Sequence, residues 1–328
     1  MSISIGPIRL AAPVLLAPMS GVTDLPFRRL VSRLGAGLVF SEMIASGEMT
    51  HRSKRSLRMI QHDSAGGPWA VQIAGRDPAV MAEAARMIEG LGADLIDINM
   101  GCPAKKVVNG LCGSALMKEP ELARQVIHAT VAAVSIPVTL KMRTGWDDSA
   151  RNAPELARIA ADIGVKMITV HGRTRCQFYK GRADWTFISE VKKAVQVPVI
   201  ANGDILSVDD ARACLTASGA DGVMIGRGTY GNPWFAGQTT RFLADGTRPA
   251  APTAAERCAV IEEHYQGLLD HYGVETGLRA ARKHLGWYAA GLPGGEAFRQ
   301  RVVRLDDPAQ VRNAIRLFFY EQPAALAA

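Results

Sequence analysis

The sequence predicts an α/β protein: a (β/α)8 TIM barrel followed by a small C-terminal helical domain. Two observations support this prediction. Eight short apolar runs alternate with helix-like stretches through residues 1–241, and the strand pattern stops after Phe242. The length of 328 residues suits it, because such a barrel typically takes about 250 residues and leaves room for one further small domain.

The expected strands are continuous apolar runs rather than alternating ones, which is typical of parallel strands buried on both faces. They are Val14–Ala17, Leu38–Ser41, Trp69–Ile73, Leu95–Asn99, Val138–Met142, Met167–His171, Val199–Asn202 and Gly222–Ile225. Apolar residues at three- and four-residue spacing predict helices over Pro78–Leu91, Glu119–Val134, Glu155–Ile163, Trp185–Val195 and Val208–Ser218. Alternating strands and helices with right-handed crossovers close naturally into a barrel.

An open doubly wound sheet is the alternative architecture. It usually carries a Gly-rich phosphate loop after its first strand, whereas here the first strand ends in Pro18-Met19-Ser20-Gly21. The strand pattern stops after Phe242, and we predict a helical domain over residues 242–328, in which the segment Arg248–Thr253 looks like a linker. The helices expected there are Ala254–His271, Gly277–Ala290 and Pro308–Tyr320.

The composition is that of an ordinary globular protein, with 48% apolar and 21% charged residues. No apolar run approaches the ~18–20 residues that span a bilayer, and no basic region precedes an apolar one near the N-terminus, so we expect a cytoplasmic protein. The five cysteines are odd in number and widely spaced without a C-x-x-C pair, which indicates reduced thiols and no metal site.

The chain carries a net charge of +7, and the whole excess lies in residues 1–241, because residues 242–328 hold 10 basic and 10 acidic residues. A basic balance favours polyanionic partners such as nucleic acid without establishing one.

Barrel enzymes place their sites on the loops at the carboxyl ends of the strands. Residues of unusual type for such positions gather at those ends here, with Gln72 within the third strand. They are Pro18, Met19 and Ser20, Glu42, Gln72, Asn99 and Cys102, Lys141 and Arg143, His171, Asn202 with Gly203 and Asp204, and Gly226 with Arg227. Their convergence on one rim predicts a single site.

The ends of the seventh and eighth strands often hold a phosphate in such barrels. Gly203, Gly226 and Gly228 let the backbone approach an anion, and Arg227 adds charge, although these glycines could instead serve only as tight turns. We expect the ring system of a phosphorylated cofactor to meet three further side chains. These are Lys141, which would stabilise an anionic reduced flavin, Gln72, which would pair with the ring edge, and His171.

Other readings remain open for Lys141 and His171. Lys141 could be a structural lysine whose charge is paired within the protein at a strand end. His171 could be a structural hydrogen-bond partner or a metal ligand. No second histidine lies at ligand spacing, which disfavours the metal.

Cys102 lies in Asn99-Met100-Gly101-Cys102-Pro103, immediately past the fourth strand. A free cysteine is mostly protonated at neutral pH, since its pKa is about 8.5, so a thiol on this loop can serve as a general acid. The alternative is a small buried apolar residue. We expect Cys112 and Cys176 to be structural.

At these residues the chain resembles the tRNA-dihydrouridine synthases, and their bacterial B-type subfamily in particular. The resemblance covers about residues 7–320. The segments that carry it are Ala17-Pro18-Met19-Ser20-Gly21-Val22-Thr23-Asp24, Asp97-Ile98-Asn99-Met100-Gly101-Cys102-Pro103, Lys141-Met142-Arg143-Thr144-Gly145-Trp146, His171-Gly172-Arg173-Thr174-Arg175, Ala201-Asn202-Gly203-Asp204-Ile205 and Ala281-Arg282-Lys283-His284-Leu285.

The resemblance implies an FMN cofactor, NADPH as reductant and a C-terminal helical domain that helps to hold tRNA. We infer no obligate protein partner from the sequence. It implies that FMN contacts Pro18, Met19, Ser20, Gln72, Lys141, His171, Asn202, Gly203, Asp204, Gly226 and Arg227. Hydride would pass to C6 of a flipped-out uracil in the D-loop, and Cys102 would protonate C5. Candidate RNA contacts are His51–Arg55 and Arg58, Lys105, Lys106, Arg173 and Arg175, and Arg279 with Arg282, Lys283 and His284.

Two other functions remain possible from the residues alone. A flavin barrel that acts on a small pyrimidine would explain the glycine and cysteine features but neither the helical tail nor the basic excess. An RNA-binding protein without flavin would not need the Lys141, Cys102 and His171 set.

Overall fold

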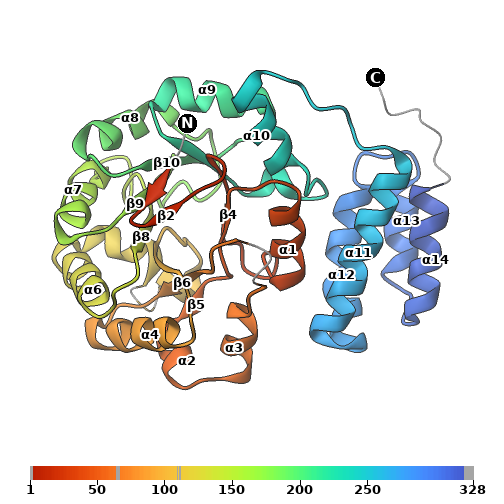
Figure 1. Cartoon of the computed structure of the whole chain (residues 1–328), viewed down its shortest axis with the longest axis horizontal. Coiled ribbons are helices and arrows are strands. Elements are labelled where there is room, and N and C mark those ends of the chain that lie inside the picture. The colour runs from red at the N-terminus through yellow and green to blue at the C-terminus, as the bar shows by residue number, and fades with distance from the viewer. Residues whose placement is uncertain (1–2, 64–66, 109, 111, 321–328) are drawn as a thin grey trace.

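The computed structural model describes residues 3–63, 67–108, 110 and 112–320. Figure 1 shows a barrel beside a bundle of helices, joined by the extended chain that follows α10 (Phe235–Asp245). The expected division into a barrel and a helical tail is therefore visible. The expected boundary after residue 241 falls within α10 and stays a prediction.

Nine short strands form one parallel sheet. They are β3 (Val14–Leu16), β4 (Leu38–Val39), β5 (Ile44–Ala45), β6 (Ala70–Ala74), β7 (Leu95–Met100), β8 (Val138–Arg143), β9 (Met167–His171), β10 (Val199–Asn202) and β11 (Gly222–Ile225). Their order is β4-β3-β11-β10-β9-β8-β7-β6-β5, and every pair is parallel. All eight strand predictions are confirmed, and their side chains are buried as expected.

The sheet closes on itself next to β4. Phe40 forms a parallel bridge with Ala70, and the Ser41 backbone N–H donates to the Ala70 carbonyl at 3.0 Å. β4 and β5 thus share the place of the second strand, one pairing with β3 and the other with β6. The predicted eight-stranded barrel is confirmed, with its second strand interrupted where Glu42 enters the rim.

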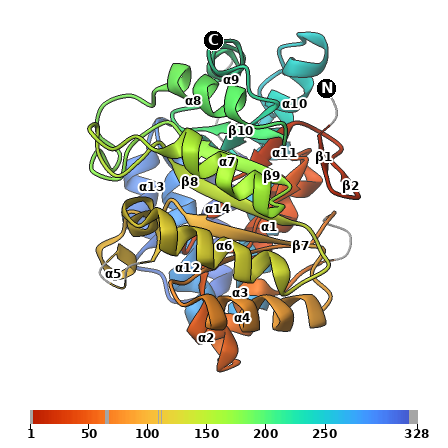
Figure 2. The same cartoon turned by 90° about the vertical axis from the view of Figure 1, so that its left-hand side faces the viewer.

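Helices cover the outer face of the barrel (Figure 2). They are α1 (Leu25–Arg33), α4 (Pro78–Gly90), α6 (Pro120–Ala132), α7 (Ala153–Ile163), α8 (Trp185–Ala194), α9 (Val208–Ser218) and α10. Side-chain caps set several of their starts: Asp184 accepts from the Phe187 N–H, and Ser207 forms a capping box with Asp210. The five predicted barrel helices are confirmed to within three residues.

The tail is a bundle of four helices with its own apolar core. They are α11 (Ala254–Tyr272), α12 (Val274–Ala289), α13 (Gly295–Val302) and α14 (Pro308–Phe319). Ile261, Leu285, Phe298 and Ile315 lie in that core. The Thr253–Glu256 capping box starts α11 directly after the linker. The three predicted tail helices are confirmed.

Several elements were not predicted. The hairpin of β1 (Ser4–Ile5) and β2 (Ile8–Arg9) and the helices α2 (Ser46–Thr50), α3 (Lys54–Ile60) and α5 (Lys105–Val108) have two to seven residues each, too few to show a periodicity. Helices α1, α10 and α13 also escaped prediction, although α1 buries Phe27, Leu30 and Val31 at helical spacing. No helix in the described ranges is long and apolar enough to cross a membrane.

Candidate active site

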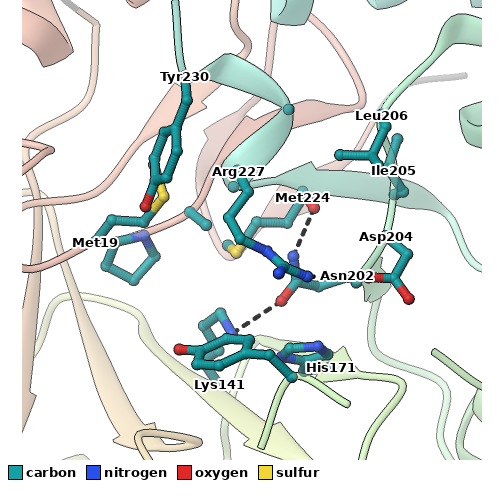
Figure 3. Close-up of a pocket in the computed structure, with 16 residues that line it drawn as sticks. Met19, Lys141, His171, Asn202, Asp204, Ile205, Leu206, Met224, Arg227 and Tyr230 are labelled. Carbon is teal, nitrogen blue, oxygen red and sulfur yellow. Dashed lines mark hydrogen bonds and ion pairs between the residues drawn. The ribbon is translucent and has the colours of Figure 1, made fainter. Parts of the chain in front are cut away.

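The twelve predicted site residues come together at the carboxyl end of the barrel, around two adjoining cavities of about 370 Å³ each. The cavities share six lining residues and so form one hollow. These are Pro18, Met19, Lys141, His171, Tyr179 and Tyr230. Asn202, Gly203, Asp204, Gly226 and Arg227 line the first cavity, and Ser20, Gln72 and Cys102 line the second. Figure 3 shows Lys141 and His171 facing Arg227 across the first.

Lys141 lies near the end of β8 and places a cation at the floor of the hollow. Its side chain is 9% exposed, and its Nζ donates to Asn202 Oδ1 at 3.1 Å. Asn202 in turn donates from Nδ2 to the Met224 carbonyl at 2.7 Å, which fixes the orientation of its amide. Burial and the neighbouring Arg143 lower the pKa of Lys141 to about 8. The lysine therefore stays largely protonated at neutral pH and can stabilise a negative charge on a bound ring.

His171 ends β9 and is neutral. Burial lowers its pKa well below the usual value, and the nearby charges of Arg143, Lys141, Arg173 and Arg227 lower it further. So many cations around one buried ring make the hollow electropositive. Such a site fits a group that carries negative charge, as a phosphate and a reduced flavin ring do.

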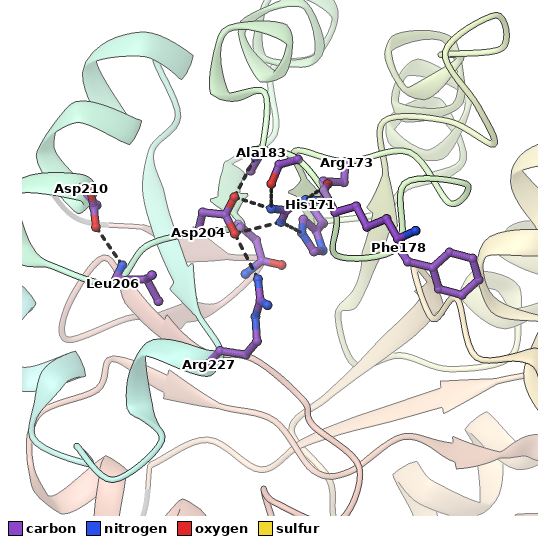
Figure 4. A network of polar contacts seen from close by, with 12 residues as sticks. His171, Arg173, Phe178, Ala183, Asp204, Leu206, Asp210 and Arg227 are labelled. Carbon is purple, nitrogen blue, oxygen red and sulfur yellow. Dashed lines mark hydrogen bonds and ion pairs between the residues drawn. The ribbon is translucent and has the colours of Figure 1, made fainter. Parts of the chain in front are cut away.

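Asp204, on the turn after β10, is the centre of a polar network (Figure 4). Its carboxylate accepts two bonds from the Arg173 guanidinium, at 2.9 and 2.5 Å, one from Arg227 at 3.0 Å and one from the Ala183 N–H at 2.8 Å. Although burial raises it, the bonds from Arg173 and Ala183 hold the pKa of Asp204 below its usual value. Because these bonds occupy its carboxylate, Asp204 serves to orient Arg227. Only the backbone of Asp204 could contact a bound anion.

Two of the three glycines in these turns are required by geometry. Gly203 has φ +116°, and a Cβ there would lie 2.8 Å from the His171 ring. A Cβ on Gly228 would lie 2.6 Å from the Ile205 carbonyl oxygen. Gly226 is different, because its nearest neighbour would be Met19 Sδ at 3.5 Å. The backbone of Gly226 and the partly exposed Arg227 therefore border open space in the first cavity, as an anion cradle needs.

A chain of hydrogen bonds connects the barrel interior to the Cys102 turn. Asp97 accepts from Thr139 Oγ1 at 2.6 Å and from Gln72 Nε2 at 2.7 Å. Gln72 Oε1 accepts from Asn99 Nδ2 at 2.8 Å, and Asn99 Oδ1 accepts from the Cys102 N–H at 3.0 Å. Because Asp97 can only accept when ionised, it fixes which way both amides point.

Cys102 lies where the second cavity meets a third, larger one of about 530 Å³. The thiol is free and partly buried, and the Cys102 carbonyl accepts from Ser114 Oγ at 2.8 Å. Arg55, Arg58 and Tyr272 line the third cavity, so it runs from the thiol toward α11. Cys112 lines it as well, whereas Cys176 is exposed.

Two arginines that support this site were not assigned that role from sequence. Arg143 and Arg173 are among the largest fully buried side chains. Arg143 donates to the carbonyls of Gly101 at 2.8 Å and Phe178 at 2.9 Å, and Arg173 to that of Gly181 at 2.7 Å. They tie the loop after β9 to the Cys102 turn and to Asp204. The signal was present for Arg143, since a basic residue at the end of a buried apolar strand must find acceptors. Arg173 lies two residues beyond β9 and is 1% exposed, so it cannot make the RNA contact expected of it.

Tyr179 and Tyr230 were also missed. Tyr179 has arginines near its ring, with Arg143 at 5.6 Å and Arg227 at 5.0 Å from its centroid. Both tyrosines lie in loops, where periodicity carries no information.

The expected RNA contacts are placed unevenly. Arg55 and Arg58 face the third cavity. Arg279 and Arg282 pair with Glu275 and Asp306. His284 is buried and so cannot contact a large ligand. The side chains of Lys105 and Lys106 lie outside the described part of the structure. In that part no cluster of three or more His, Cys, Asp or Glu is arranged to hold a metal ion.

The fold and the cation-lined hollow are those of a barrel protein whose rim is suited to an anionic ligand. Among solved structures, an old yellow enzyme homologue from Zymomonas mobilis has a similar fold, with a TM-score of 0.52 at 15% identity over 78% of this chain and 94% of that one.

A family model described as Dihydrouridine synthase (Dus) matches residues 15–322, and the chain belongs to that family of flavin-dependent oxidoreductases. It is 55% identical over 319 residues to a protein of Rickettsia conorii named "Probable tRNA-dihydrouridine synthase", covering 97% of this chain and 96% of that one. It is 50% identical over 304 residues to "tRNA-dihydrouridine synthase B" of Xanthomonas axonopodis pv. citri, covering 93% and 92%. The resemblance seen in the motifs is confirmed.

Proposed function

We propose that this protein is a tRNA-dihydrouridine synthase that uses FMN and NADPH to reduce the C5–C6 bond of a D-loop uridine. The observation that carries the proposal is the convergence of all twelve predicted site residues on one electropositive hollow, with Cys102 at its edge. The names of the relatives support tRNA as the substrate. We place the reaction in the cytoplasm and infer no obligate protein partner.

FMN fits the hollow in two respects. The turns after β10 and β11 offer Gly203, Gly226 and Arg227 to a phosphate, and Lys141 offers a positive charge to the ring. Bound FMN would supply hydride to the substrate after reduction by NADPH. Pro18, Met19 and Ser20 would hold the ring from the opposite wall, where they line the second cavity.

Cys102 would supply the proton to C5 of the uracil. Its position between two cavities allows a base to enter through the third cavity and to meet both the thiol and the cofactor hollow. This arrangement requires a base that has left its stack, which costs a few kcal/mol in RNA. Arg55 and Arg58 line the same entrance and would bind the RNA backbone. This binding would offset part of the free energy needed to unstack the base.

The test is direct measurement of dihydrouridine. Protein loaded with FMN is mixed with NADPH and an unmodified tRNA transcript. The tRNA is then digested, and its nucleosides are separated and identified by mass spectrometry. We expect dihydrouridine in the D-loop, with Cys102→Ala inactive and Cys176→Ala, a change at an exposed cysteine, active. Reduction of a free pyrimidine but not of tRNA would overturn the proposal.

A further inference from the structure

Helix α12 of the tail contacts the barrel rim beside the cofactor hollow at two points. Trp287, near its C-terminal end, stacks on Tyr230 with ring centroids 4.1 Å apart and planes 9° from parallel. Lys283, one turn earlier, donates from Nζ to the Gly21 carbonyl. Tyr230 follows β11 and Gly21 follows β3, so one tail helix contacts two loops of the barrel rim.

Trp287 packs with the core of the barrel rather than with that of the tail. The approach is close, because a Cβ on Gly231 would lie 2.2 Å from the Trp287 carbonyl oxygen. Tyr230 is itself partly buried and lines both cofactor cavities. The indole therefore supports a tyrosine that forms part of the wall of the hollow.

The contact of Lys283 with Gly21 is linked to Met19 through a tight turn. Met19 O accepts from the Val22 and Thr23 N–H groups at 2.9 and 3.0 Å, and the Met19 N–H donates to Thr23 Oγ1 at 2.9 Å. Gly21 lies inside this turn, so its position and that of Met19 are linked. Met19 lies beside Tyr230 on one wall of the hollow (Figure 3).

We propose that α12 forms the outer support of the cofactor site, with Trp287 and Lys283 as positioning residues that act through Tyr230 and Met19. The helical domain then contributes to cofactor binding as well as to RNA binding. This inference rests on the proposed FMN cofactor. It predicts that changes on α12 alter FMN affinity in the absence of any RNA.

The experiment measures FMN binding to the full-length apoprotein by quenching of FMN fluorescence. Loss of a stacked aromatic pair in Trp287→Ala should weaken FMN roughly three- to tenfold, and Trp287→Phe, which keeps a ring there, should restore most of the affinity. Lys283→Ala should weaken FMN roughly two- to fivefold. The absorbance band of bound FMN should shift in Trp287→Ala, because the wall beside the ring has moved.

Two matched controls separate this effect from general damage to the tail. Phe318→Ala removes a ring stacked on Phe298 within the tail, at 4.5 Å. Arg279→Ala removes a cation of α12 that forms an ion pair with Glu275 of the same helix. Both should bind FMN as the wild type does. Wild-type affinity and spectrum in Trp287→Ala and Lys283→Ala would overturn the inference while leaving the proposed function intact. Failure of the wild-type apoprotein to bind FMN would overturn both.

Discussion

Replacing Asp97 by Asn would remove a buried carboxylate from the interior of the barrel. The Asp97 side chain is 1% exposed, and burial raises its pKa from 3.8 to about 6. Asn has nearly the same shape, and its amide can still accept from Gln72 and donate to the Thr139 hydroxyl. The hydrogen-bond chain to Cys102 can therefore survive the loss of the charge.

The effect on stability follows from the raised pKa. Between pH 3.8 and 6 the folded protein holds a proton that the unfolded chain has released, so the free energy of unfolding falls as the pH rises through this window. Above pH 6 the buried Asp97 charge lowers the free energy of unfolding by about 3 kcal/mol, at ~1.36 kcal/mol per pKa unit. Asp97→Asn should therefore raise stability by up to about 3 kcal/mol at pH 7.5 and by little at pH 4.

Although Asp97→Asn should stabilise the fold, it should impair the cofactor site by lowering the pKa of Lys141. The Asp97 charge raises the pKa of Lys141, against the lowering by burial and by Arg143. Without it, Lys141 loses its proton at a lower pH. The alkaline limb of flavin reduction should then move to lower pH, because the deprotonated lysine no longer stabilises the reduced ring.

Urea unfolding at the two pH values and the pH profile of NADPH-driven flavin reduction measure both effects. Asp94→Asn is the matched control, since Asp94 precedes the same strand and accepts from the Trp69 N–H at 2.7 Å. A less stable Asp97→Asn protein at pH 7.5, or an alkaline limb that does not move, would refute the reasoning.

Three further predictions concern single side chains. Cys102→Ala should leave NADPH-driven bleaching unchanged but slow reoxidation by tRNA roughly 10²- to 10⁴-fold in stopped flow; a wild-type rate of reoxidation would rule out its role as the acid. Burial lowers the pKa of His264 to about 3 and that of His284 well below its usual value, so the unfolded chain gains protons first on acidification. His264 alone should lower the free energy of unfolding in urea by about 2 kcal/mol from pH 7.5 to 5, against a gain of about 1 kcal/mol as Asp97 takes up its proton over the same range; a protein that is more stable at pH 5 than at pH 7.5 would contradict this. Arg227→Ala should weaken FMN roughly ten- to hundredfold by fluorescence titration, whereas Arg248→Ala, at an exposed pair with Asp209, should not.

The barrel was predictable because its signal is local. Strands Met167–His171, Val199–Asn202 and Gly222–Ile225 have the predicted bounds, since a buried parallel strand is apolar throughout and ends at polar or glycine residues. The site followed from the same rule, because the carboxyl ends of all strands meet at one rim.

The roles that escaped prediction depend on contacts between distant parts of the chain. Nothing near Asp204 in the sequence shows that Arg173 will occupy its carboxylate, or that Gln72 will be engaged by Asp97. The stacking of Trp287 on Tyr230 joins two domains. Helical periodicity predicts α12 but not which of its residues face the barrel.

The absorbance spectrum of the purified protein, followed in one cuvette by anaerobic NADPH and then by unmodified tRNA, tests the central claim most directly. We predict a flavin spectrum that bleaches with NADPH and recovers when tRNA is added. A flavin that bleaches but does not recover with tRNA would contradict the assignment of the substrate. A protein that shows no flavin spectrum even after reconstitution with FMN would contradict the assignment of the hollow as a cofactor site.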